Sequence, residues 1–341
     1  MKISENNSVW KFLKELSTKK GISEITINGE NQAFIEKDGE FIGLNVSLPM
    51  DDIFTFSKEV CAYNNEEFNE SEPIFDGILP DGSRINIIAK PFVKSGIAIT
   101  IRKYLLKNHG LNHAPNLFDF DPKWLPFFRS LVSGRFNVII SGGTSVGKTT
   151  LMNMLISEIG VGERLITIED TLELNINRKN YVALETSAKS KVSVSDLVKN
   201  SLRMKPDRIF IGEVRGKEAF DLMQAMNTGH EGSMSTIHAN SAIEALTRLE
   251  TLYMMSGYNF TTPVVRSHIS SGVDFIIQLS RDMTGKRFIN EIVEVGGMEG
   301  DTILFSPIFE RENGLLNFTG IPPSGLERMT TYGELEADFF E

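Results

Sequence analysis

The chain has 341 residues, of which 41% are hydrophobic and 23% charged, and its formal net charge is −10. This balance is typical of a folded protein with room for two domains, and the negative charge disfavours nucleic acid as the main partner. The single cysteine, Cys61, excludes an intrachain disulfide framework and a cysteine zinc site. No apolar run is long enough to span a membrane and the N-terminus lacks a signal-peptide core, so we expect a cytoplasmic protein.

The first part of the chain predicts a small α+β domain over residues 1–105. Residues 9–16 and 51–63 have helical spacing, and short β-branched runs lie between and after them. Because turn residues separate these runs, we expect an antiparallel sheet. Residues 106–122 carry Asn, Gly and Pro and are expected to form a linker. The runs that predict strands are 24–28, 32–36, 41–44, 73–79, 84–89 and 96–101.

Strand-like and helical patterns alternate over residues 123–341. This alternation predicts a mostly parallel sheet with helices on both faces. After about residue 281 we expect hairpin strands and then a tail that contains Pro and Gly. The expected strands are 136–141, 164–170, 181–184, 208–212, 233–237, 273–279, 287–295 and 302–309, and the expected helices are 150–156, 194–204, 217–227 and 242–255.

Residues 142–149 match the phosphate-binding pattern G-x-x-x-x-G-K-[ST] at every fixed position, between a predicted strand and a predicted helix. The backbone N–H groups of such a loop surround a phosphate, and the helix N-terminus adds the positive end of a dipole. Lys148 is then expected to reach the β- and γ-phosphates, and Thr149 to place its hydroxyl on Mg²⁺. The alternative is a glycine-rich turn without a ligand. The expected nucleotide-binding residues are Gly142, Gly143, Thr144, Ser145, Val146, Gly147, Lys148, Thr149 and Thr150.

Acidic residues follow two predicted strands of the same sheet. Glu169 and Asp170 end one strand, with Glu173 close behind, and Glu213 follows another. In open α/β sheets ligands bind beyond the carboxyl ends of the strands. Carboxylates there can hold Mg²⁺ through water or orient the attacking water, and Glu213 is expected to take its proton. For Glu169 and Asp170 a solvated acidic turn is an equal alternative.

Two histidines and two arginines complete the candidate site. We expect His230 to contact the γ-phosphate and report its loss, and His238 to be structural or supporting; a histidine in a buried polar network is the alternative. Arg84 follows a turn and Arg102 ends a β run. An arginine supplied by another domain or subunit can stabilise the transferred phosphate, worth about 10³–10⁵ in rate, although most such arginines are solvated surface residues.

The order of these motifs resembles the secretion ATPase superfamily, the motors of type II and type IV secretion and of type IV pili. Several further segments look closest to its tight-adherence (Tad), CpaF-like pilus branch, namely 79–86, 202–208, 224–230 and 318–323. The loop reads Thr-Ser-Val-Gly where that branch more often has Thr-Gly-Ser-Gly. The matching boxes are Walker A at 142–149, the Asp box at 168–173, Walker B at 208–215 and the His box at 229–240.

The resemblance implies an N-terminal α/β domain followed by a RecA-like ATPase domain. It implies a ring of six subunits that binds ATP and Mg²⁺ between the domains and drives pilus assembly or protein secretion across the bacterial envelope. The partner would be an inner-membrane platform protein, with no nucleic acid partner. A conjugation-type ATPase of type IV secretion and a non-hydrolysing ATP-binding scaffold ring are the alternatives. The catalytic residues it implies are Glu213, Lys148, Glu169, Asp170, Glu173, His230, Arg84 and Arg102, with Thr149 and Glu213 at the metal.

Overall fold

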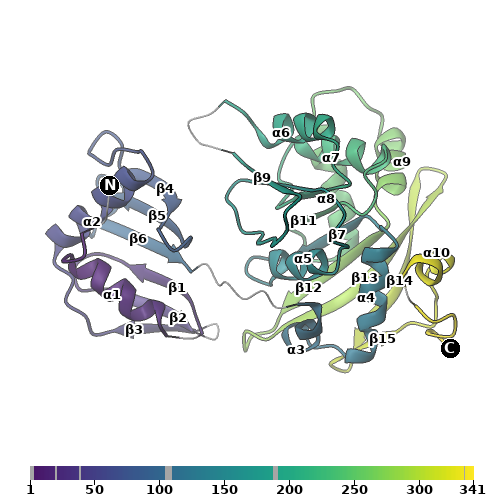
Figure 1. Cartoon of the computed structure of the whole chain (residues 1–341), viewed down its shortest axis with the longest axis horizontal. Coiled ribbons are helices and arrows are strands. Elements are labelled where there is room, and N and C mark those ends of the chain that lie inside the picture. The colour runs from purple at the N-terminus through teal and green to yellow at the C-terminus, as the bar shows by residue number, and fades with distance from the viewer. Residues whose placement is uncertain (1–3, 20, 38–39, 104–109, 187–190, 334) are drawn as a thin grey trace. The chain divides into compact units, whose positions relative to one another are not determined.

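The computed structural model of the protein describes residues 4–19, 21–37, 40–103, 110–186, 191–333 and 335–341. Its contacts separate two compact units, Met1–Lys107 and Asn108–Glu341, which Figure 1 shows with their elements labelled. No helix within the described ranges is long and apolar enough to cross a membrane.

The first unit contains, within its described residues, one sheet of six strands in the order β3-β2-β1-β6-β5-β4. Every neighbouring pair is antiparallel, which confirms the prediction for this region. Buried residues alternate along β5 and β6 and share one core with the apolar faces of α1 and α2. The elements are α1 (Ser8–Ser17), β1 (Ile22–Ile27), β2 (Ala33–Lys37), β3 (Glu40–Leu44), α2 (Met50–Tyr63), β4 (Ile74–Ile78), β5 (Arg84–Ala89) and β6 (Ile97–Arg102).

The second unit is built, in its described part, on a sheet of nine strands in the order β15-β14-β13-β12-β7-β11-β10-β8-β9. From β12 to β9 in that order the strands are parallel, as predicted. β13, β14 and β15 extend the sheet through antiparallel pairs. The strands are β7 (Val138–Gly142), β8 (Leu165–Glu169), β9 (Tyr181–Glu185), β10 (Arg208–Ile211), β11 (Met234–Ile237), β12 (Phe275–Arg281), β13 (Arg287–Glu299), β14 (Thr302–Glu312) and β15 (Leu315–Phe318).

Helices cover both faces of this sheet, and each face has its own apolar core. In β7, Val138 and Ile140 lie in the core shared with α4 and α5, whereas Ile139 lies in the core shared with α7, α8 and α9. Strands buried on both faces are continuous apolar runs, which is why the sequence reveals them. The helices are α3 (Ala114–Phe118), α4 (Leu125–Ser133), α5 (Lys148–Ser157), α6 (Val194–Ser201), α7 (Glu218–Asn227), α8 (Ala242–Met254), α9 (Thr262–Gly272) and α10 (Leu326–Tyr332), with short 3₁₀ turns η1 (Leu111–His113), η2 (Pro122–Trp124) and η3 (Leu202–Met204).

The segment 106–122 differs from the expected linker. Residues 106–109 lie outside the described residues, and the remainder forms helical turns. Leu111 and Phe118 are fully buried in the core of the second unit. Pro115 stands in the first turn of α3, where its missing N–H breaks no helical hydrogen bond, so it starts a helix instead of interrupting one. The described part of this segment is therefore a packed edge of the second unit.

Besides α3 and the 3₁₀ turns η1 and η2, four elements of the second unit are additional to the predictions: α4, α9, α10 and β15. α9 shows why such helices escape sequence reasoning. Its buried residues are Val265, Ile269 and Gly272, spaced four and three residues apart among mostly polar neighbours. A stripe this narrow carries little periodic signal, so tertiary packing decides the helix.

Candidate nucleotide site

The glycine loop, residues 142–147, connects β7 to α5 at the carboxyl edge of the parallel sheet. Gly142 and Gly147 adopt φ of +154° and +99°, which side-chain-bearing residues rarely adopt. A Cβ on Gly142 would lie 2.6 Å from the carbonyl oxygen of Leu279, and one on Gly147 would lie 3.0 Å from the ring of Phe118. Gly147 is the N-cap of α5 and no side chain of the described residues caps this helix. The loop therefore has the backbone shape and the open helix terminus that a phosphate requires.

Ser145 stands where the resembling Tad branch more often has glycine, and its φ is +60°. A left-handed backbone is easy for glycine and costs a serine free energy, so the loop is held in this shape by its surroundings. Val146, at 5% exposure, packs beside Gly142 and supplies such a contact.

Lys148 is the first residue of α5, and its ammonium is folded onto the glycine loop. Nζ donates to the carbonyl oxygens of Gly142 at 2.9 Å and Gly143 at 2.8 Å. Burial lowers the pKa of Lys148 to about 8, although the nearby Glu213 carboxylate opposes that shift. The ammonium also lies 3.4 Å from both ring nitrogens of His238. Lys148 is thus placed at the loop, with polar partners that a phosphate group can replace.

Glu213 follows β10 and has one partner on each carboxylate oxygen. Nη2 of Arg215 donates to Oε2 at 2.7 Å, and Nε2 of His238 lies 3.1 Å from Oε1. Burial raises the pKa of Glu213, but the hydrogen bond from Arg215 and the neighbouring positive charges outweigh burial and leave the pKa below its ordinary value. Glu213 is therefore ionised and oriented at neutral pH.

His238 connects Lys148 to Glu213. Burial and the positive charge of Lys148 lower the pKa of His238, while Glu213 opposes the shift, so the ring is neutral at neutral pH. We accordingly assign its contact with Glu213 as a hydrogen bond donated by Nε2 and not as an ion pair, which leaves Nδ1 to accept from Lys148. With Arg215, which donates to Glu213, these side chains form a connected polar line beside the glycine loop, Lys148–His238–Glu213–Arg215.

The acidic residues after β8 have two different environments. Asp170 lies 3.6 Å from Nη1 of Arg215 and accepts a hydrogen bond from Thr186. Glu169 is only 3% exposed, and burial raises its pKa to about 7. Its Oε1 accepts hydrogen bonds from the backbone N–H groups of Glu173 at 3.0 Å and Leu174 at 3.1 Å. Asp170 is therefore connected to the site by its contact with Arg215, whereas Glu169 stabilises the turn that carries Glu173.

The hydroxyl of Thr149 and the carboxylates of Glu213 and Asp170 are hard oxygen donors at this edge, the class of ligand that Mg²⁺ prefers. Thr149 lies in the first turn of α5, directly after Lys148. Thr150 follows it, and both side chains are half-buried. The residue types present therefore fit a site for Mg²⁺ and a nucleotide, with Thr144 and Ser145 exposed at its mouth.

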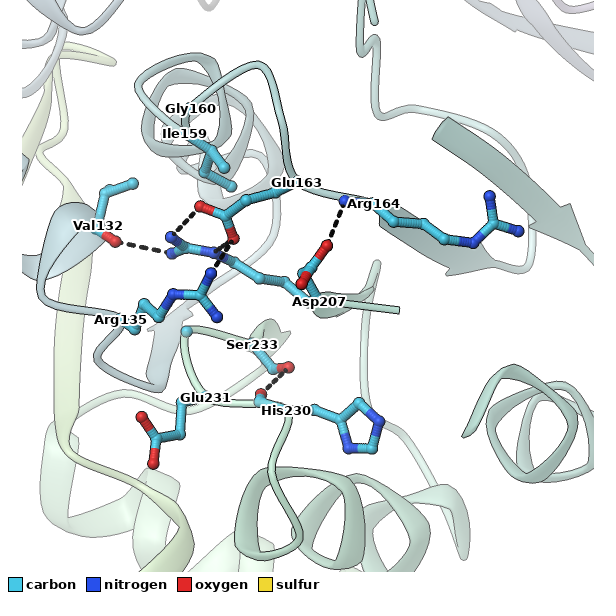
Figure 2. Close-up of polar contacts among 12 residues, drawn as sticks. Val132, Arg135, Ile159, Gly160, Glu163, Arg164, Asp207, His230, Glu231 and Ser233 are labelled. Carbon is cyan, nitrogen blue, oxygen red and sulfur yellow. Dashed lines mark hydrogen bonds and ion pairs between the residues drawn. The ribbon is translucent and has the colours of Figure 1, made fainter. Parts of the chain in front are cut away.

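His230, which the sequence predicts to contact the γ-phosphate, lies away from this line, and that contact stays a prediction. It precedes β11, so it lies at the amino edge of the sheet, roughly 13 Å of strand from the carboxyl edge. Figure 2 shows it beside Ser233, which donates to its carbonyl oxygen at 2.6 Å. His238 follows the same strand at the other end and contacts Lys148 instead. The rule that ligands bind at the carboxyl ends of strands, applied to β11, would have selected His238.

Arg84 and Arg102 belong to the first unit and lie directly opposite each other on β5 and β6. Their neighbours Ile85 and Ile101 are buried, so the two arginines share the face that points away from the helices. Glu24 is the register partner of Arg102 on β1. The two arginines thus lie side by side on one face, and their contact with a phosphate stays a prediction.

Comparisons with known proteins relate the chain to secretion system proteins. The family described as "Type II/IV secretion system protein" matches residues 7–298. The chain is 34% identical over 280 residues to conjugal transfer protein TrbB of Rhizobium radiobacter, which covers 81% of this chain and 84% of TrbB. It is 30% identical over 322 residues to type IV secretion system protein VirB11 of Bartonella quintana, covering 82% and 89%.

Two solved structures have a similar fold. The ATPase DotB of Legionella pneumophila matches with a TM-score of 0.64 at 21% identity, over 86% of this chain and 83% of DotB. The pilus retraction motor PilT with bound ADP matches with a TM-score of 0.60 at 19% identity, over 97% and 88%. Both agree with the fold class predicted from the sequence.

Proposed function

Because this chain belongs to the type II/IV secretion system protein family, we propose that it is an ATP-hydrolysing motor of a conjugation-type or related type IV secretion system. The observation that carries the proposal is the polar line Lys148–His238–Glu213–Arg215 beside the glycine loop. Relatives named for conjugal transfer and type IV secretion favour this assignment over the Tad pilus branch, which stays a prediction.

The proposed hydrolysis follows from the site's charges. Backbone N–H groups of the glycine loop bind the phosphates, and Lys148 exchanges its two carbonyl partners for phosphate oxygens. Glu213, kept ionised, takes the proton of the attacking water while Arg215 and His238 hold its orientation. Mg²⁺, for which Thr149 and Glu213 supply oxygen donors, would neutralise charge on the phosphates. His238 is the histidine placed to register the γ-phosphate, because it touches both Lys148 and Glu213.

We further propose a homo-oligomeric ring, a hexamer by resemblance, in which Arg84 and Arg102 act on the phosphate of a neighbouring subunit. The ring would work at the cytoplasmic side of the inner membrane with a membrane-embedded platform protein. The register of β5 and β6 brings the two guanidinium-bearing residues together on one face, and two arginines placed together can bind one phosphate, which supports the assignment.

A subunit-mixing experiment tests the motor and its assembly together. Arg84→Ala and Glu213→Gln are purified separately, and each is expected to lose at least about 10²-fold in ATP turnover while remaining folded. Mixed under exchange conditions, the two should recover part of the activity, because intact arginines and intact glutamates then meet across subunits. Lys94→Ala, an exposed cation of the same unit, is the control and should be fully active.

Three outcomes would count against parts of this proposal. A mixture that stays inactive, although subunits are shown to exchange, rejects action of Arg84 across subunits. A wild-type protein that binds ATP without turnover, even when concentrated and supplied with lipid, supports the scaffold alternative. Loss of piliation without loss of conjugal transfer after gene deletion would favour the Tad branch.

A further inference from the structure

The segment that joins His238 to α8 is held at both ends by side chains of the neighbouring strands. Nε2 of Gln278 donates to the carbonyl oxygen of Ala239 at 3.3 Å. Oε1 of Glu291 accepts the backbone N–H of Ala242 at 2.8 Å. Gln278 on β12 and Glu291 on β13 are direct register partners, so they form one polar clamp on this segment.

Burial of the Gln278 side chain is unfavourable for the free energy of folding. It is 1% exposed, and its Oε1 has no hydrogen-bond partner among the described residues. Ser141, its register partner on β7, likewise has a buried Oγ without a partner in the described part of the chain. Apolar residues would fill this layer at lower cost, because a buried unpaired polar group loses its hydration without compensation. Apolar packing therefore does not account for the glutamine, whose amide serves two backbone carbonyl groups, those of Leu279 on its own strand and of Ala239.

The position of Gln278 offers another reason. β7 lies between β12 and β11, so the glutamine reaches across the end of β7, where Gly142 begins the glycine loop, to the residue after His238. Figure 1 labels all three strands in the second unit. Its amide thus connects the strand end at the loop to the histidine that touches Lys148 and Glu213.

We propose that Gln278 is a positioning residue for the hydrolysis proposed above: by holding Ala239 it keeps the ring of His238 between Lys148 and Glu213. The proposal rests on that function. The ring contacts of 3.1 and 3.4 Å leave little tolerance, and a displacement of about 1 Å in a catalytic site can cost on the order of 10²-fold in rate. Nε2 of Gln278 also donates to the carbonyl oxygen of Leu279 at 3.2 Å, but only the bond to Ala239 reaches the segment that carries His238. Because that segment loses a single hydrogen bond, we expect a milder fall of about tenfold.

Gln278→Met tests this, because methionine keeps the volume and removes the amide. We expect kcat for ATP hydrolysis to fall about tenfold and the affinity for a fluorescent ATP analogue to stay within about twofold of wild type. The unfolding temperature should not fall, because the substitution also removes the buried unpaired Oε1. The matched control is Thr167→Val, another buried polar residue of the sheet, whose hydroxyl contacts only Tyr181 among the described residues. It should leave kcat unchanged.

A double-mutant cycle separates positioning from general damage. In a His238→Ala background, Gln278→Met should cause no further fall in turnover, because the group it positions is gone. An equal fall in both backgrounds would overturn the proposal. Gln278→Asn, whose amide is one carbon too short to reach Ala239, replaces the methionine variant if that variant does not fold.

A readout without turnover distinguishes failure of this proposal from failure of the proposed function. Modification of His238 by diethylpyrocarbonate, followed by mass spectrometry with exposed His113 as the internal reference, should be several times faster in Gln278→Met than in wild type or Thr167→Val. An unchanged rate rejects the positioning role. If His238 is modified faster in Gln278→Met but the wild-type protein hydrolyses no ATP, the positioning role stands and the proposed hydrolysis is rejected.

Discussion

The ion pair between Arg208 and Glu163 leads to the most demanding stability prediction. Arg208 begins β10 and is 1% exposed, and its Nε and Nη2 donate to the two carboxylate oxygens of Glu163 at 2.7 and 2.8 Å. Its Nη1 donates to the carbonyl oxygen of Val132 at 2.7 Å. Figure 2 shows Glu163 at the centre of these contacts, with Arg135 as a second cationic partner. The guanidinium is therefore enclosed by protein and depends on Glu163 for its charge balance.

Glu163→Gln leaves that guanidinium buried without a countercharge. Removal of one partner from a buried ion pair costs about 3–5 kcal/mol of unfolding free energy. The Glu163 side chain retains 17% exposure, and glutamine keeps one acceptor oxygen, so we expect the low end, about 3 kcal/mol. The apolar double variant Arg208→Met with Glu163→Leu should recover most of this loss, because no buried charge remains.

Urea unfolding measures the loss. In a Trp10→Phe background Trp124 is the single tryptophan, so its fluorescence reports on the second unit alone. Glu231→Gln is the control: its contact with Arg328 is 3.2 Å, but the Glu231 side chain is 61% exposed, so it should cost less than about 1 kcal/mol. If Glu163→Gln costs no more than this control, the reasoning from burial is refuted.

Three further predictions follow from pKa shifts. Burial raises the pKa of Cys61 to about 12, and the thiolate is the form that reacts with Ellman's reagent. The thiol should therefore react only as urea unfolds the first unit, and rapid reaction of the native protein would contradict this. Burial raises the pKa of Glu169 to about 7, so the folded state holds this proton more tightly than the unfolded chain and wild-type stability falls as pH rises from about 4.5 to about 7. Glu169→Gln removes that loss, and its stability relative to wild type in urea should be greater at about pH 8 than at about pH 5; a pH-independent difference would refute the shift. Lys148→Met should abolish ATP turnover, because the ammonium proposed to bind the phosphates is removed. It should not lower the unfolding temperature, because burial disfavours the charged form of Lys148; a large decrease in that temperature would show that its carbonyl contacts matter more than burial.

The features whose signal is local could be predicted from the sequence. The glycine loop, its lysine and the strand that precedes Glu213 lie within short windows, where glycine spacing and β-branched runs reflect backbone geometry directly. The parallel sheet followed from alternation of strands and helices for the same reason. Even Arg84 and Arg102 were selected from their own strand ends, and only the register of β5 and β6 revealed that they are paired.

The tertiary structure decided the contacts between segments far apart in the chain. The order of the strands brings His238 to Lys148, 90 residues away, and sends His230 to the opposite edge. The same order brings Gln278 to Ala239, although no local pattern distinguishes a buried glutamine that positions a loop from one that is exposed. A short stretch of sequence indicates which backbone conformations are low in free energy. The partner of a buried polar group depends instead on which strands become neighbours, and the packing of the whole core decides that.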